Sequence, residues 1–149
     1  MRVSTLLFSL FSLIVLVSSC NKFNAEEQAL WDEVMKLHDD SMLNHGVMMK
    51  NTSQIRKKIK SGEIQPNMVE AFKPSLEKID AADEAMMSWM SDLKGPVKLS
   101  GKSHEEIMAY LQGEKVKIEQ IDKNIVAQLT ISRNILNVLE PQTPPVQNQ

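Results

Sequence analysis

Residues 103–141 read SHEEIMAYLQGEKVKIEQIDKNIVAQLTISRNILNVLEP, and this segment is the strongest indication of the fold class. Ser103 followed by Glu106 is a capping box, the pattern that starts a helix. Large apolar residues then recur at the spacings of one helix face: Ile107, Leu111, Ile118, Ile121, Ile125, Leu129, Leu136 and Leu139. Because Pro141 cannot continue a helix, we predict one long amphipathic helix over residues 104–140.

Another helix is predicted over residues 25–60. Asn24 and Glu27 form a second capping box, and Gly62 supplies a stop signal after a basic last turn. The predicted inner face consists of Trp31, Met35, His38, Met42, His45, Met49, Thr52, Ile55 and Ile59. Gly46 leaves three alternatives open, namely a close helix approach, a kink or a break, because a mid-helix glycine costs about 1 kcal/mol relative to alanine.

Between these two lies a helix predicted over residues 66–94. Its apolar side consists of Phe72, Leu76, Ile79, Ala82, Met86, Trp89 and Leu93. Pro74 removes one backbone donor inside it and is expected to kink or divide the helix. Gly95 and the following proline end it, and a loop over residues 97–102 leads to the last helix.

Three amphipathic helices joined by short loops predict an all-α fold. The simplest arrangement is an up-down-up antiparallel three-helix bundle that forms one domain over residues 25–140. The alternative is a helical hairpin that completes its core by dimerising. Alternating strand patterns are absent from the sequence, which argues against a sheet.

The first nineteen residues resemble a bacterial export signal. Arg2 supplies the positive start, and the apolar segment over residues 6–17 would reach about 18 Å as a helix, too short for a bilayer core of about 30 Å. The Val17-Ser18-Ser19-Cys20 run resembles the lipobox, in which the cysteine is diacylglycerated before cleavage. We therefore predict a lipoprotein signal peptide over residues 1–19 and a lipid anchor, palmitate included, on Cys20. The alternative is a free thiol after an ordinary secretory signal.

The predicted location is the bacterial cell envelope. Two or three acyl chains hold a protein on a membrane stably, so the domain would be tethered outside the cytoplasm by a lipidated linker over residues 20–24. Asn21 does not match the aspartate that retains some lipoproteins at the inner membrane, which favours the outer membrane. The proline- and glutamine-rich tail over residues 141–149 is predicted to be disordered.

Composition restricts the function classes. With Arg2 removed, 16 of the 17 basic side chains remain against 19 acidic ones, a formal charge of −3 that argues against nucleic acid as a partner. A single cysteine excludes a disulfide framework. The chain has no Glu-x-x-His or His-Glu-x-x-His motif and no glycine-rich phosphate loop, so we predict a non-enzymatic protein with an interaction or scaffold role. A protein partner or self-association is compatible with that role.

Methionine and histidine are distributed unusually. The candidate ligands of a metal site are Met35, His38, Met42, Met86 and Met90, with Trp89 beside them and His45 as the weakest member. Antiparallel packing is expected to bring residue 38 next to residue 86. Asp39 and Asp40 are expected to be poor partners for His38, since neighbouring helix positions point in different directions.

Three interpretations of this cluster stay open. Methionine fills irregular cores and packs well against aromatic rings, so the cluster is first of all expected to be core, with no cofactor. Thioether ligands select soft monovalent copper and imidazole is a common companion, which predicts a Cu(I) site as the alternative. The third interpretation is a haem held between methionine and histidine.

Two motifs in the same region carry a family resemblance. The run His38-Asp39-Asp40-Ser41-Met42 with Gly46 four residues later, and the run from Ala82 to Met90, resemble small bacterial helical lipoproteins that often bear the automatic label "viral A-type inclusion protein". The label implies no viral role. The resemblance implies the lipoprotein class and no particular activity. Similar proteins often carry a methionine where His45 stands and an acidic residue where Ser88 stands.

Overall fold

The computed structural model describes residues 23–140, which form helices and the loops between them. The elements are α1 (Ala25–Lys60), α2 (Pro66–Asp92), α3 (Pro96–Leu99) and α4 (His104–Leu139). The all-α prediction is confirmed. The predicted signal peptide, Cys20 and the tail over residues 141–149 lie outside the described residues. Within the described part, no helix combines the length and apolar character that crossing a bilayer requires.

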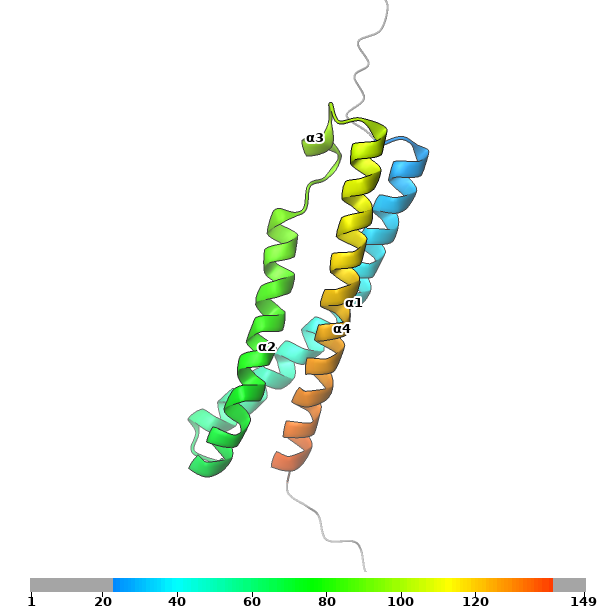
Figure 1. Ribbon diagram of the computed structural model, residues 1–149. Coiled ribbons are helices and arrows are strands. Elements are labelled where there is room, and N and C mark those ends of the chain that lie inside the picture. The colour runs from blue at the N-terminus through cyan, green and yellow to red at the C-terminus, as the bar shows by residue number, and fades with distance from the viewer. Residues whose placement is uncertain (1–22, 141–149) are drawn as a thin grey trace, which may run out of the picture.

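The helices form an elongated bundle. Figure 1 shows that α1 and α4 begin at the same end, whereas α2 runs in the opposite direction. α1 crosses α4, so that the end of α1 lies beside the start of α2 (Figure 1). The interface between α1 and α4 is the most extensive, that between α2 and α4 is smaller, and that between α1 and α2 is the smallest. α4 is therefore the helix that both others share.

Capping boxes start α1 and α4. The Asn24 side chain accepts hydrogen bonds from the backbone N–H groups of Glu26 and Glu27, each 3.0 Å long. The Glu27 carboxylate in turn accepts from the Asn24 backbone N–H at 2.9 Å. Ser103 and Glu106 make the same reciprocal pair at the start of α4. These bonds satisfy donors that would otherwise have no partner at a helix start.

Neither Gly46, where a break was one of three alternatives, nor Pro74, expected to kink or divide its helix, interrupts the helix that contains it. α1 continues through Gly46, and α2 continues through Pro74. Pro74 lies near the start of α2 on its exposed side, where water can satisfy the carbonyl that loses its intrahelical donor. The short helix α3 occupies part of the stretch expected as a loop, and it begins with Pro96, whose fixed φ suits a first helical position.

The inner face of α1 differs from the predicted one. Its buried positions are Glu27, Val34, Ser41, His45, Met48, Thr52 and Ile55. Five of these are spaced seven residues apart, the repeat of helices that pack side by side over a long distance. Met35, Met42 and Met49, predicted to be central, are each one position further on and only half-buried. The prediction of these three as central core residues is wrong, because the seam toward α4 follows the seven-residue repeat.

The core has two parts. The larger one joins all three long helices and contains Val34, Met48, Ile79, Ala82, Met86, Trp89, Ile118, Ile125 and Leu129. The smaller one lies where α1 and α4 begin and contains Leu99, Ile107 and Leu111, with Phe23, Leu30, Trp31 and Tyr110 packed against it. Leu99 comes from α3, which explains why this short helix folds back onto the bundle.

Candidate functional site

His38 on α1 and Met90 on α2 are two predicted ligands that lie in contact. The His38 Nε2 atom is 3.1 Å from the Met90 Sδ atom. The imidazole stacks on the indole of Trp89, with 5.6 Å between ring centroids and 29° between the planes. The His38 side chain is only 16% exposed, so the contact is largely shielded from water. Residue 38 thus lies beside residue 90, one helical turn further along α2 than expected.

Asp39 holds the other nitrogen of the same ring. The His38 Nδ1 atom lies 3.0 Å from the Asp39 Oδ1 atom, on the exposed side of the contact. The expectation that Asp39 is a poor partner is therefore wrong, because an exposed carboxylate can rotate toward the outer edge of the adjacent ring. Asp40 instead pairs with Lys36 at 2.5 Å.

The remaining candidate ligands lie at different depths. Met86, one turn before Met90, is fully buried and belongs to the larger core cluster, and Met42, one turn after His38, is half-buried and packs against that cluster. Met35 is half-buried one turn before His38, outside the set of described side chains that pack against this cluster. Within residues 23–140, no three histidine, cysteine, aspartate or glutamate side chains gather closely enough to hold a metal ion. A metal here would need thioether ligands.

His45 is buried and paired. Its Nε2 atom lies 2.7 Å from the Asp83 Oδ1 atom of α2, and its side chain is 9% exposed. An ion pair or hydrogen bond of this kind satisfies a polar ring inside the bundle. The continuous helix at Gly46 keeps His45 facing inward, and its contact with Asp83 directs Nε2 away from the Met90 thioether.

Ser41, His45 and Asp83 are the residue types of a hydrolytic triad, but their geometry is not that of one. The Ser41 side chain is 0% exposed, and its Oγ atom has no hydrogen-bond partner among the described residues. Nucleophilic catalysis needs a hydroxyl that contacts both its base and the substrate. Ser41 is better explained as a small residue that lets α1 approach its neighbours closely.

A buried carboxylate that is not among the predicted site residues lies at the contact of α2 with α4. Glu114 is 5% exposed and accepts a hydrogen bond of 2.8 Å from the Trp89 indole N–H. Its second oxygen accepts from the Lys117 ammonium at 2.8 Å, and this bond raises the pKa of Lys117. The available signal was a glutamate at a position of the apolar repeat in α4, between Leu111 and Ile118.

A hollow of about 540 Å³ opens beside this carboxylate, between α2 and α4. Ala85, Trp89 and Ile121 give it buried or half-buried apolar walls, whereas Asp92 and Lys117 are exposed around it. The hollow therefore combines apolar surface with charges of both signs.

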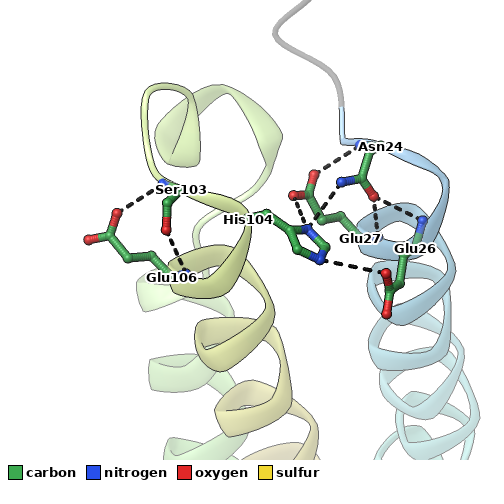
Figure 2. Close-up of polar contacts among 6 residues, drawn as sticks. All are labelled: Asn24, Glu26, Glu27, Ser103, His104 and Glu106. Atoms are coloured by element: carbon green, nitrogen blue, oxygen red, sulfur yellow. Dashed lines mark hydrogen bonds and ion pairs between the residues drawn. The ribbon is translucent and has the colours of Figure 1, made fainter.

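A second polar group joins the starts of α1 and α4, and we call its members, Asn24, Glu26, Glu27 and His104, the clasp (Figure 2). The His104 Nδ1 atom lies 2.9 Å from the Glu27 Oε1 atom and 3.1 Å from the Asn24 Nδ2 atom. The His104 Nε2 atom lies 3.5 Å from the Glu26 Oε2 atom. The clasp was not predicted, because its partners are almost eighty residues apart in sequence.

The clasp shifts the ionisation of its members. The hydrogen bond to Glu27, helped by the charge of Glu26, raises the pKa of His104 above its ordinary value. The same bond, together with the backbone N–H of Asn24, lowers the pKa of Glu27. The pair thus favours the charged forms of both partners.

Comparisons with protein-family models, with curated proteins and with solved structures find no match for this chain. The geometry of its own residues therefore carries the functional argument. Two arrangements stand out: the clasp at the end where the chain enters the fold, and the His38–Met90 contact in the interior.

Proposed function

We propose that this chain is a non-enzymatic lipoprotein of the bacterial cell envelope with a scaffold or interaction role. In this proposal, acyl chains on Cys20 anchor it, the outer membrane being favoured, after removal of residues 1–19. An up-down-up antiparallel bundle of three long helices then extends from the membrane. The partner is another protein or a second copy of the chain.

The observation that carries the proposal is how soon the fold begins after Cys20. Phe23 already packs on Trp31, with 5.8 Å between ring centroids, and Asn24 already caps α1 and contacts His104. Three residues span at most about 11 Å, so an acylated Cys20 would hold the clasp end close to the bilayer surface. The 36 residues of α1 rise about 54 Å, so in this proposal the turn before α2 lies far from the membrane.

The interior supports a structural role for the polar side chains. His45 with Asp83 and Trp89 with Glu114 link different helices through short hydrogen bonds. Such pairs satisfy buried polar atoms and restrict the ways in which the helices can pack. A bundle held in this way suits a spacer or a docking platform.

The anchor is tested by metabolic labelling with an alkyne analogue of palmitate and by mass spectrometry of the full chain. The wild type should carry the label and begin at Cys20, whereas Cys20→Ala should carry no label and keep residues 1–19. Ser19→Ala, which keeps a small residue before the cysteine, is the matched control and should be labelled. A wild-type chain without acyl label would overturn the proposed anchor.

The orientation is tested separately with a fluorophore on an introduced cysteine. Glu105→Cys labels the clasp end and Lys60→Cys labels the end of α1, and both positions are exposed. In vesicles with nitroxide-bearing lipids, the label at position 105 should be quenched more strongly than the label at position 60. Equal quenching would contradict a bundle that extends from the membrane by its clasp end.

A further inference from the structure

The His38 ring lies between two groups that can only accept a hydrogen bond. The Asp39 carboxylate faces Nδ1 at 3.0 Å, and the Met90 thioether faces Nε2 at 3.1 Å. A neutral imidazole has one N–H, so either tautomer satisfies one neighbour and leaves a nitrogen lone pair facing the lone pairs of the other. Both contacts are satisfied only when the neutral ring gains a second cation, which is either another proton or a metal ion.

The two contacts suit different occupants. A carboxylate is a strong acceptor for an N–H, which favours the proton on Nδ1 and leaves the Nε2 lone pair directed at the sulfur atom of Met90. This is the usual arrangement of a metal-bound histidine, in which a carboxylate holds the other ring nitrogen and orients the ring. In this tautomer, Nε2 and Sδ form a pair of donor atoms that converge from two helices.

The chemistry of the donors selects the ion. Thioether sulfur is a soft ligand that prefers Cu(I), whereas Zn²⁺ is usually held by four thiolate, imidazole or carboxylate ligands. Within residues 23–140 no three histidine, cysteine or acidic side chains gather in one place, so no described site provides such a set. The stacked Trp89 ring covers one face of His38 and limits access of water to the contact.

We propose that His38 Nε2 and Met90 Sδ bind one Cu(I) ion, with Met42 as a third ligand and Asp39 as the residue that positions the ring. Met42 lies one helical turn from His38 on the same side of α1, and its flexible side chain is half-buried in the same cluster as Met90. The ion displaces no proton when Nδ1 carries the ring hydrogen. This site goes beyond the scaffold role and does not depend on Cys20.

The test uses the full chain, purified in detergent without oxygen, in competition with the chromogenic Cu(I) chelator bicinchoninate. The wild type should withdraw one equivalent of Cu(I) from the chelator. Met90→Leu is nearly isosteric and should keep the fold, and it should weaken binding by more than tenfold. Asp39→Asn should weaken binding by about tenfold, the usual effect of losing an orienting carboxylate.

Met87→Leu is the matched control. Met87 follows Met86 but is 41% exposed, so its substitution should leave Cu(I) affinity unchanged. Tryptophan fluorescence, to which Trp31 also contributes, gives an independent signal, and its Trp89 component should fall on Cu(I) addition in the wild type and in Met87→Leu, but not in Met90→Leu. The proposal is overturned if the wild type withdraws no Cu(I), or if Met90→Leu binds as tightly as Met87→Leu does.

Discussion

α1 and α2 both pack against α4, but they are held in different ways. The contacts of α1 with α4 run from Glu27 and His104 at one end to Asn51 and Ser132 toward the other. α2 makes a smaller contact with α4 and very little with α1. Much of the link between α1 and α2 is polar, and it includes the bond between His45 and Asp83.

This difference indicates which helix is expected to loosen first. α2 makes smaller contacts with its neighbours than α1 and α4 make with each other, so we expect α2 to be the less stable element. Its position depends more on individual hydrogen bonds, such as the one between Trp89 and Glu114. The proposed Cu(I) ligands His38 and Met90 lie on opposite sides of the contact between α1 and α2. An ion bound to both would therefore link these two helices.

The largest effect is expected from truncating a side chain of α4 that lies in the core shared by α1 and α2. Ile118 of α4 is fully buried in the core cluster that joins the three long helices. Ile118→Ala should lower the free energy of unfolding by about 2–5 kcal/mol, because it leaves a cavity as well as losing apolar contact. Val116→Ala, at a residue that is 58% exposed, should change it by less than about 0.5 kcal/mol. Urea unfolding followed by circular dichroism measures both, and similar losses would refute the assigned core.

Loss of one hydrogen bond at the contact of α2 with α4 should destabilise α2 more than α1. Glu114→Leu leaves the buried Trp89 N–H without its acceptor, which costs about 1–3 kcal/mol. Hydrogen exchange under native conditions should show faster exchange of the α2 amides, whereas those in the middle of α1 should change less. Glu114→Gln keeps an acceptor oxygen and should have a smaller effect. Equal acceleration in both helices would mean that α2 is not a separately weakened element.

The sequence predicts the helices well because their signals are local. Capping boxes at Asn24 and Ser103 mark two helix starts, and the apolar repeat identifies the buried faces of α2 and α4. On the inner face of α1, the predictions of His45, Thr52 and Ile55 are confirmed, whereas Met35, Met42 and Met49 each lie one position beyond the buried residue. Hydrophobicity favours Met42 over its neighbour Ser41, whereas close packing against a parallel helix favours the smaller residue in the seam.

The candidate site was only partly predictable, because it depends on register between helices. The sequence indicates that His38 faces α2, but the length of the turn decides that it meets Met90 and not Met86. The clasp depends on α1 and α4 starting at the same level, which neither caps nor periodicity determines. Contacts of this kind follow from the tertiary packing alone.

A glycine substitution tests whether α1 needs a close backbone approach at Gly46. A Cβ atom at Gly46 would meet no atom within 4 Å, in an exposed stretch of helix. Gly46→Ala should therefore stabilise the protein by about 0.5–1 kcal/mol through helix propensity. Gly62→Ala has equal space but a φ of +76°, and it should destabilise the protein by about 1–2 kcal/mol. Thermal unfolding distinguishes them, and a loss in Gly46→Ala would reveal a close approach.

The smallest effect is expected at the clasp, where water screens the charges because His104 is 41% exposed. The pKa of His104 is raised above 6.5 in the folded chain, so its contribution is complete below pH 6.5 and is lost as the pH rises through the raised value. The pKa of Glu27 is lowered below 4.5, so its contribution is complete above pH 4.5 and is lost as the pH falls through the lowered value. The clasp should therefore stabilise the fold most between pH 4.5 and pH 6.5, where both contributions are complete.

His104→Gln should consequently lower the melting temperature at pH 5.5 and have less effect at pH 8.5, where less of the wild-type ring is protonated. Glu106→Gln is the control at the same helix start, because the lowered pKa of Glu106 comes from the Ser103 backbone N–H and from Lys102, not from a histidine. Its effect should be similar at both pH values, since the wild-type carboxylate is charged at each. If the His104→Gln effect does not change with pH, the contact between α1 and α4 at this end is held by the small apolar core around Leu111 and not by the charge of the clasp.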